Sequence, residues 1–326
     1  MHCIIIFIIL FILISQAYFF RVITAGIYDS YYIPHVHSRT HTLKKTAAQH
    51  TSPLIKFCSG IHKPHNMQVF RFCRLAVLYT LRKTIMTKFY LQFKYIADFF
   101  VALIGIIVAS PIMAVIAVAI KIEDGGNVLL RQDRTGRYGK KFVCYKFRSM
   151  KGENVPFDKH RPVIKDNNEN LTKVGKVIRK FKLDELPQIV NVLKGDMCFI
   201  GPRPLLPVYD CEYQNWELIK FEMRPGLTGL SQVRGNGHLS IKARKYYDAY
   251  YVTHASPLLD IKIIIKTVAV LFVGERRFLR HVPVEEYAEL KNLIESKYTI
   301  NRQTYLNFGL TPPEESGDNN TCKTDE

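Results

Sequence analysis

The sequence has no closely spaced pairs of cysteines, although it contains seven cysteines in 326 residues. Zinc sites and thiol redox motifs need cysteines a few residues apart, and small secreted domains need a denser set. The scattered, odd-numbered set argues against a disulfide scaffold and indicates reduced thiols in a reducing compartment. The chain also has no internal repeat.

Acidic residues are scarce, with 28 Asp and Glu against 46 Lys and Arg and a net charge of +18. Such a charge implies an anionic partner: nucleic acid, anionic lipid or a phosphorylated substrate. A nucleic-acid-binding protein is one alternative, but the chain contains no recognised nucleic-acid motif and it carries long apolar runs. The 48% hydrophobic content excludes a disordered polyelectrolyte.

The first 85 residues differ in composition from the rest, because they are rich in histidine and their only acidic residue is Asp29. Their apolar run at 4–20 lacks the basic residues that precede the apolar core of a signal peptide, and it is close to the lower limit for spanning a membrane. We expect the working domain to begin near Met86. Residues 1–85 are then an accessory anchor or the product of a misplaced start codon.

The strongest apolar run covers 96–120, has Asp98 as its only charged residue and is flanked by Lys94 and Lys121. Ser110 and Pro111 fall in its middle, where proline removes a helix hydrogen bond. Each half is then about 10 to 14 residues long, which is short for a span. Basic residues at both ends fit a helix-break-helix hairpin that enters and leaves on the cytoplasmic face. A kinked spanning helix is an equally good interpretation of this pattern.

Two strand-like runs follow, VLLRQDR and KKFVCYKFRSM, joined by the turn-rich TGRYGK. This pattern predicts a β-hairpin. Its many cations predict a positive patch close to the membrane. A later apolar run at 258–273 contains three charged residues and predicts an interfacial amphipathic helix.

The segment LDELPQIVNVLKGD has apolar residues at helical spacing, Pro187 in the predicted first turn and Gly195 at the end. Asp184 is expected to be the N-cap, where the helix terminus favours an ionised carboxylate and binds phosphate. The adjacent Asp184 and Glu185 are the candidate catalytic pair, since a carboxylate can accept a phosphoryl group. Taken alone, a purely structural role as N-cap and first-turn acid is the commoner one.

Several motifs in this order resemble those of the bacterial sugar transferase family, the monotopic polyprenyl-phosphate phosphoglycosyl transferases. The resemblance covers about residues 88–274. The motifs are the Ser110-Pro111 pair, RQDRTGRYGKKF, YKFRSM, LTKVGKVIRKFKLDELPQIVNVLKGDM, FIGPRPLLP, RPGLTGLSQVRG and LLDIKIIIKT. Such a combination is far more specific than a lone glycine motif.

The resemblance implies a re-entrant helix broken at Ser110 and Pro111, and a Mg²⁺-dependent site at the Asp184-Glu185 dyad. Asp184 is then the nucleophile that attacks the sugar-linked phosphate of a UDP-sugar, expels UMP and passes the phosphosugar to polyprenyl phosphate. Glu185 is expected to place Mg²⁺ or to assist proton transfer. A direct transfer with Asp184 as metal ligand, and a catalytically silent scaffold of the same fold, are the alternatives.

Four cations are candidate phosphate contacts: Lys146, Arg148, Arg179 and Arg203. Each could equally be a solvated or lipid-facing cation, although Arg203 is held between two prolines. Gln188 is either a further site residue or an exposed helix amide. The chain departs from the family pattern at Lys182, at Cys198 and in the NENLT segment ending at Thr172, where the usual arginine is missing.

The expected fold is α/β: a helix-rich monotopic membrane domain with a Pro-broken re-entrant helix, a small β-hairpin and interfacial amphipathic helices. We divide the chain into an N-terminal extension (1–85), a re-entrant helix (86–122), a catalytic domain (123–274) and a C-terminal helix with a disordered tail (275–326). The expected location is the cytoplasmic face of the bacterial inner membrane. Expected partners are a UDP-sugar, polyprenyl phosphate, membrane lipid and downstream glycosyltransferases. The sequence leaves the sugar, the glycan pathway and the oligomeric state open.

Overall fold

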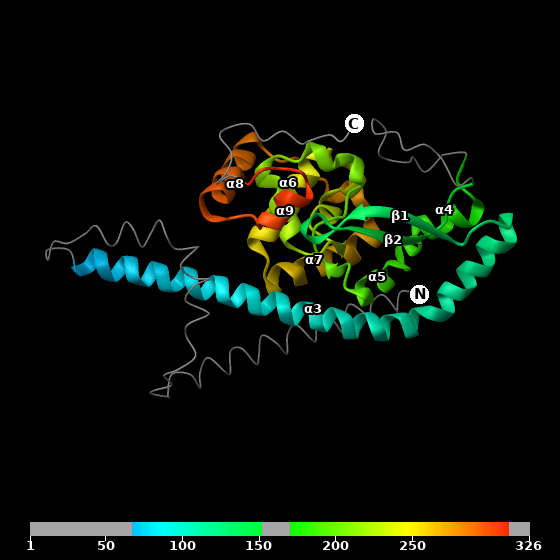
Figure 1. Ribbon diagram of the computed structural model, residues 1–326. Coiled ribbons are helices and arrows are strands. Elements are labelled where there is room, and N and C mark those ends of the chain that lie inside the picture. The colour runs from blue at the N-terminus through cyan, green and yellow to red at the C-terminus, as the bar shows by residue number, and fades with distance from the viewer. Residues whose placement is uncertain (1–66, 152–169, 313–326) are drawn as a thin grey trace.

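The computed structural model describes residues 67–151 and 170–312, and this part of the protein is helix-rich (Figure 1). Predictions about residues 1–66 and about the tail beyond residue 312 lie outside the described residues. The α-helices are α3 (Met67–Asp124), α4 (Lys173–Lys180), α5 (Gln188–Lys194), α6 (Ile241–His254), α7 (Pro257–Val273), α8 (Val284–Lys297) and α9 (Arg302–Asn307). The strands are β1 (Leu129–Thr135), β2 (Lys141–Phe147), β3 (Cys198–Ile200) and β4 (Gly226–Thr228).

Helix α3 has 58 residues, runs along one side of the folded part and curves toward its C-terminal end (Figure 1). Within its segment Phe89–Asp124, the most apolar 18-residue stretch has a mean hydropathy of 2.8, yet only 22% of that stretch is buried. Among the described residues it is the one helix long and apolar enough to cross a membrane. An apolar helix that leaves most of its surface uncovered is typical of membrane association.

Ser110 and Pro111 lie inside α3, and the helix continues through them. The predicted interruption of the helix at this pair is therefore not found. Pro111 has no N–H to donate to the carbonyl of Ile107, one turn earlier. The Ser110 hydroxyl donates to that carbonyl instead, at 2.8 Å, so the helix tolerates proline without a break.

The inner face of α3 is joined to the folded part by a buried ion pair and its hydrogen bonds. Lys94 Nζ donates to Asp260 Oδ2 of α7 at 2.6 Å and to the Ile200 carbonyl of β3 at 2.5 Å. Tyr251 of α6 donates to the other oxygen of Asp260 at 2.6 Å. Lys94 and Asp260 are almost fully buried. Such a pair holds its elements in one arrangement, because breaking it would leave a charge buried without a partner.

The predicted β-hairpin is confirmed, with β1 and β2 antiparallel and Thr135 opposite Lys141. Its turn is the 3₁₀ segment η2 (Arg137–Gly139), in which Tyr138 has a φ of 57°. The side chain of Asn191 in α5 joins the hairpin to the helix. Its amide donates to the Val143 carbonyl at 2.7 Å, and its oxygen accepts from the Tyr145 N–H at 3.1 Å.

Strands β3 and β4 form a second, parallel pair. A Cβ on Gly226 would lie 2.1 Å from the main-chain nitrogen of Gly201, so the two backbones can approach this closely only with glycine. The core packs around these strands and includes Ile189 and Trp216. Gly201, the residue that follows β3, therefore packs directly against the backbone of β4 at the core.

The 258–273 run forms α7, and Ser256 caps it by accepting from the Leu259 N–H. Its inner face buries Ile263 and Ile264, while Leu258 and Phe272 are about 60% exposed. This two-sided pattern agrees with the predicted amphipathic helix. Helices α8 and α9 follow, and in Figure 1 they lie in the left part of the folded region, with α8 at its upper left edge.

Candidate active site

The Asp184-Glu185 dyad lies in a single 3₁₀ turn, η3 (Leu183–Glu185), directly before α5. Lys182 enters this turn with a φ of 56°. Helix α5 starts only at Gln188, with Pro187 as its N-cap, and ends at Gly195 with a φ of 82°. The prediction that Asp184 is the N-cap is therefore wrong, while the predicted end at Gly195 is confirmed. Proline fixes its own φ and cannot donate an N–H, which sets the start of the regular helix.

The Asp184 carboxyl is partly buried, and one of its oxygens lacks a hydrogen-bond partner in the described part of the chain. That oxygen, Oδ1, is inaccessible to solvent. Burial raises the pKa of Asp184, and the neighbouring charge of Glu185 raises it further; Lys146 and Arg179 oppose this in part. A carboxylate of this kind is poorly solvated and is available to bind a metal or attack an electrophile.

The Glu185 carboxyl has the opposite environment. Its Oε1 accepts from Lys146 Nζ of β2 at 2.9 Å and lies 3.5 Å from a guanidinium nitrogen of Arg203. Burial alone would raise the pKa of Glu185, but the charges of Lys146 and Arg203 outweigh it and hold that pKa well below its usual range. Two adjacent carboxyls thus have their pKa values pushed apart, which is typical of carboxyls with different chemical roles.

Of the four predicted phosphate contacts, three surround the dyad. Lys146 and Arg203 contact Glu185, and the charge of Arg179 in α4 lowers the pKa of Asp184. The fourth, Arg148, is engaged elsewhere. It forms a two-point ion pair with Asp124, the last residue of α3, and donates to the Asn127 carbonyl at 2.5 Å. Arg148 therefore ties the end of α3 to the hairpin, and its contact with phosphate stays a prediction.

Two arginines beside Arg203, the half-buried Arg134 and the buried Arg244, were not predicted as site residues. Arg134 of β1 donates to the Pro204 carbonyl at 3.1 Å, and Arg244 of α6 donates to the Gly237 carbonyl at 3.1 Å. The Nε of each is buried and has no partner in the described part of the chain. Burial, followed by repulsion from Arg203, lowers the pKa of Arg134 to about 10 and also lowers that of Arg244.

Positive charge is in excess around these guanidiniums, because Arg203 has Glu185 as its carboxylate partner while neither Arg134 nor Arg244 forms a salt bridge among the described residues. Burying like charges together is costly unless an anion joins them. Sequence offers a weak signal for Arg134, which stands in the cationic hairpin. For Arg244 there is none, since it stands on an otherwise ordinary aromatic helix.

The loop that carries Arg203 is hydrogen-bonded to Asp248 of α6, which is fully buried. Asp248 accepts from the Arg203 main-chain N–H at 3.2 Å, from Ser231 Oγ at 2.9 Å and from Lys220 Nζ at 2.9 Å. Lys220 also donates to the Arg203 carbonyl at 3.0 Å. The main chain of Arg203 is fixed on both sides, so its guanidinium is pre-positioned toward Glu185.

Lys182 and Gln188 complete the surroundings of the dyad. Lys182 Nζ lies 2.7 Å from Glu275 Oε1, so the 3₁₀ segment η8 (Glu275–Phe278) reaches the dyad turn. Gln188 is 4% exposed, so its interpretation as an exposed amide is wrong.

The two dyad carboxylates are the possible metal ligands here. No group of three or more His, Cys, Asp or Glu suited to a metal occurs in residues 67–151 and 170–312. Mg²⁺ is commonly bound by one or two protein carboxylates together with substrate phosphates. The unpartnered Oδ1 of Asp184 fits that requirement.

Comparison of the sequence with known proteins identifies the family of this chain. The sequence profile described as bacterial sugar transferase matches residues 89–274. The chain is 36% identical over 195 residues to an uncharacterised sugar transferase, EpsL, of Bacillus subtilis, covering 60% of this chain and 95% of that protein.

Longer relatives are similar over the same region. One is a UDP-N-acetylgalactosamine-undecaprenyl-phosphate N-acetylgalactosaminephosphotransferase of Aeromonas hydrophila, 37% identical over 54% of this chain and 43% of that protein. Another is a UDP-glucose:undecaprenyl-phosphate glucose-1-phosphate transferase of Klebsiella pneumoniae, 37% identical over 57% of this chain and 41% of that protein. The buried dyad and its cations all lie within the matched residues, and the chain belongs to the bacterial sugar transferase family.

Proposed function

We propose that this protein transfers a sugar 1-phosphate from a UDP-sugar to undecaprenyl or another polyprenyl phosphate and releases UMP. The observation that carries the proposal is the unequal dyad: Asp184, whose buried Oδ1 has no hydrogen-bond partner among the described residues, next to a Glu185 held by Lys146 and Arg203. The names of the Aeromonas and Klebsiella relatives describe this reaction with two different sugars. The shared chemistry is at the donor diphosphate, and the sugar of this protein remains to be measured.

The reaction we propose proceeds through a covalent intermediate on Asp184. A carboxylate oxygen of Asp184 attacks the sugar-linked phosphorus, and the bond from that phosphorus to the UMP oxygen breaks. UMP leaves with the bonding electron pair, and the sugar phosphate is held as an acyl phosphate. A phosphate oxygen of the polyprenyl phosphate then attacks the same phosphorus and restores the Asp184 carboxylate.

The cations supply the charge compensation that this reaction needs. A diphosphate substrate concentrates negative charge, and positive groups at the transferring phosphoryl stabilise the transition state. Lys146 and Arg179 act on Asp184, whereas Arg203, which also contacts Glu185, lies beside Arg134 and Arg244, neither of which forms a salt bridge among the described residues. We assign the first pair to the transferring phosphate and the other three cations to the phosphate that leaves with UMP.

Asp184 and Glu185 are the residues that would hold Mg²⁺ together with the substrate phosphates. When bound, the ion would neutralise phosphate charge and improve UMP as a leaving group. Glu185 stays anionic because of its cation partners, so it suits this role better than that of a proton donor.

The membrane placement that we propose is monotopic, on the cytoplasmic face of the bacterial inner membrane. One face of α3 packs against the folded part from Tyr90 to Ile120. If this segment crossed the bilayer, it would carry the charged domain into hydrocarbon, which is unfavourable. A re-entrant or surface-lying α3 keeps that face in protein and leaves the other in lipid. The product would then be available to downstream glycosyltransferases of capsule, O-antigen, exopolysaccharide or glycoprotein glycan synthesis.

The test is UMP release by detergent-solubilised protein from a panel of UDP-sugars, with polyprenyl phosphate and Mg²⁺. We expect one donor or a few to give lipid-dependent UMP, and Asp184→Ala to abolish it. Incubation with the productive donor alone should add the mass of one phosphosugar to a peptide containing Asp184. Turnover without that adduct would favour direct transfer with Asp184 as metal ligand. Folded protein that releases UMP from no donor would favour the silent scaffold.

A further inference from the structure

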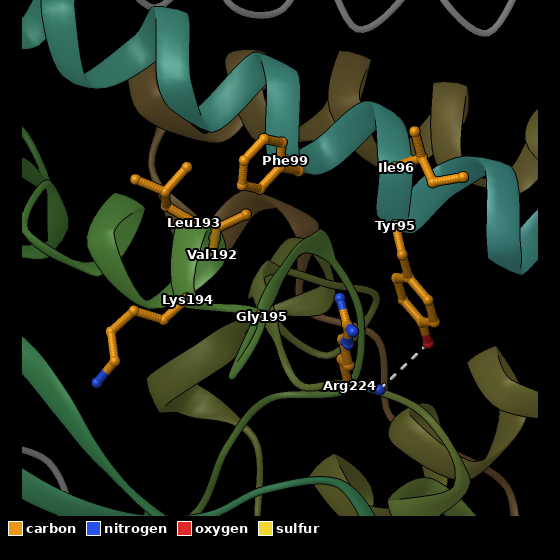
Figure 2. Close-up of a pocket in the computed structure, with 8 residues that line it drawn as sticks. All are labelled: Tyr95, Ile96, Phe99, Val192, Leu193, Lys194, Gly195 and Arg224. Atoms are coloured by element: carbon orange, nitrogen blue, oxygen red, sulfur yellow. Dashed lines mark hydrogen bonds between the residues drawn. The ribbon is translucent and has the colours of Figure 1, made fainter.

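A second cationic hollow lies at the C-terminal end of α5, away from the dyad, between that helix and α3 (Figure 2). It has a volume of about 370 Å³. Its lining combines apolar and cationic side chains: Tyr95, Ile96, Phe99, Val192, Leu193, Lys194, Gly195 and Arg224. Neither the dyad nor any predicted site residue belongs to this lining.

The principal cation is Arg224, at the inner wall of the hollow. Its guanidinium carbon lies 4.4 Å from the centroid of the Tyr95 ring, and its main-chain N–H donates to the Tyr95 hydroxyl at 3.3 Å (Figure 2). Among the described residues no carboxylate lies within salt-bridge distance of it, although the buried Asp98 is near enough to interact with its charge. The ring orients the guanidinium without neutralising it, so Arg224 retains its capacity to bind an anion.

Lys194 supplies a second positive charge at the rim. Its side chain is 51% exposed, and Asp196 lies 3.6 Å from its amine. That contact is long and open to solvent, so it contributes little to holding the amine in place. The amine also lies 5.6 Å from the centroid of the Tyr145 ring, and it points away from Arg224 in Figure 2. The flexible stem of lysine lets this amine turn toward an anion bound near Arg224.

The apolar part of the lining leads out onto the uncovered surface of α3. Ile96 and Phe99 are 59% and 45% exposed, and Leu103, one turn further on, is 43% exposed. Residues three and four apart lie on the same side of a helix, so these three form one stripe that begins at the hollow. An anion-binding cation at one end of an exposed apolar stripe is complementary to a molecule with a phosphate and a hydrocarbon chain.

We propose that this hollow binds an anionic phospholipid of the membrane, with the phosphate at Arg224 and Lys194 and an acyl chain along Ile96, Phe99 and Leu103. The proposal rests on the membrane placement proposed above but not on the chemistry of the dyad. The occupant is not the acceptor substrate in a reacting position. Helix α5 has seven residues, so its ends are about 10 Å apart at 1.5 Å per residue. A phosphate in the hollow is therefore out of reach of Asp184.

Native mass spectrometry of the full chain in detergent tests this, with phosphatidylglycerol and phosphatidylcholine of identical acyl chains as probes. We expect phosphatidylglycerol to be retained about tenfold better. The double variant Lys194→Gln/Arg224→Gln should lose this preference. The matched control Lys262→Gln/Arg277→Gln removes the same charges from exposed positions outside the hollow and should keep it. Equal retention of the two lipids, or loss of the preference in the control, would overturn the proposal.

Two further arms separate the sources of phosphate. Inorganic phosphate at millimolar concentration should not displace the lipid, and displacement would indicate a free-phosphate site. Polyprenyl phosphate should not compete at equal concentration, and full competition would make the hollow an acceptor site.

Lys194→Glu alone tests the charge without disturbing the Arg224-Tyr95 contact and should also weaken phosphatidylglycerol retention. Asp184→Asn should retain the lipid normally, so this experiment does not depend on the outcome for the proposed reaction.

Discussion

Lys146 Nζ lies 2.9 Å from Glu185 Oε1, so a β-strand cation forms an ion pair with one member of the dyad, while Oδ1 of the other member has no hydrogen-bond partner among the described residues. The contact depends on Asn191, whose side chain joins the α5 backbone to the strand through Val143 and Tyr145. Asn191 is completely buried. The separation of roles between Asp184 and Glu185 thus follows from how the hairpin docks on α5.

Replacing Asp184 should remove activity without weakening the fold. We expect Asp184→Asn to reduce UMP release by about 1000-fold or more, because the nucleophile is lost. The melting temperature should stay the same or rise, since Oδ1 forms no hydrogen bond in the described residues and burial disfavours its charge. Thermal unfolding followed by circular dichroism gives the second measurement. A marked loss of stability would mean that Asp184 is chiefly structural.

Glu185→Gln should behave differently, because it removes the partner of two buried or half-buried cations, Lys146 and Arg203. Both activity and melting temperature should fall, and the apparent affinity for Mg²⁺ should weaken. The measurement is UMP release against Mg²⁺ concentration. An unchanged Mg²⁺ dependence would argue against Glu185 as a metal ligand.

The pH dependence of the reaction should follow the raised pKa of Asp184. The nucleophile must be ionised, so activity should fall as the pH drops through that pKa, at a higher pH than for an ordinary aspartate. Lys146 lowers the pKa of Asp184, so Lys146→Met should move the acid limb of the rate profile to still higher pH.

The exposed Lys173, at the start of α4, provides the matched control for this pH experiment. Lys173→Met should leave the midpoint of the acid limb where it is in the wild type. A profile that is identical in Lys146→Met and wild type would show that the group titrating in the acid limb is not Asp184.

Asp248 should be required to position Arg203. Asp248→Asn leaves Lys220 buried without its counter-charge and weakens the support of the Arg203 loop. We expect a loss of about 3–5 kcal/mol in the free energy of unfolding, measured by urea denaturation. The control is Lys291→Ala, which breaks an exposed pair with Glu295 and should cost less than about 1 kcal/mol. Equal effects of the two substitutions would contradict the assigned role of Asp248.

The path of α3 can be tested by labelling single cysteines at exposed positions near the two ends of its apolar segment, Phe89→Cys and Ile122→Cys, with the native cysteines replaced. Both sites should react with a membrane-impermeant maleimide from the cytoplasmic side of oriented vesicles. Labelling of the two sites from opposite sides would establish a spanning helix. Ser110→Ala, which removes the hydroxyl that satisfies the Ile107 carbonyl, should leave the labelling side unchanged.

The sequence by itself determined the features that depend on neighbouring residues. The hairpin follows from two β-rich runs around a glycine-containing turn, and the end of α5 follows from Gly195, which can adopt a positive φ. The Asp184-Glu185 dyad and its family follow from motifs that are contiguous in the chain.

Only the tertiary structure decided which charges meet, because a cation on one element acts on whatever other elements bring within a few ångströms of it. Arg148 was expected at the phosphate and pairs with Asp124, while the unpredicted Arg134 and Arg244 gather beside Arg203. The sequence pattern also predicted a helix break at Pro111, which the structure does not have. The hydroxyl of the preceding Ser110 donates to the Ile107 carbonyl, and α3 is continuous there. The opposite pKa shifts of Asp184 and Glu185 arise in the same way, from unequal burial and unequal partners supplied by β2 and the Arg203 loop.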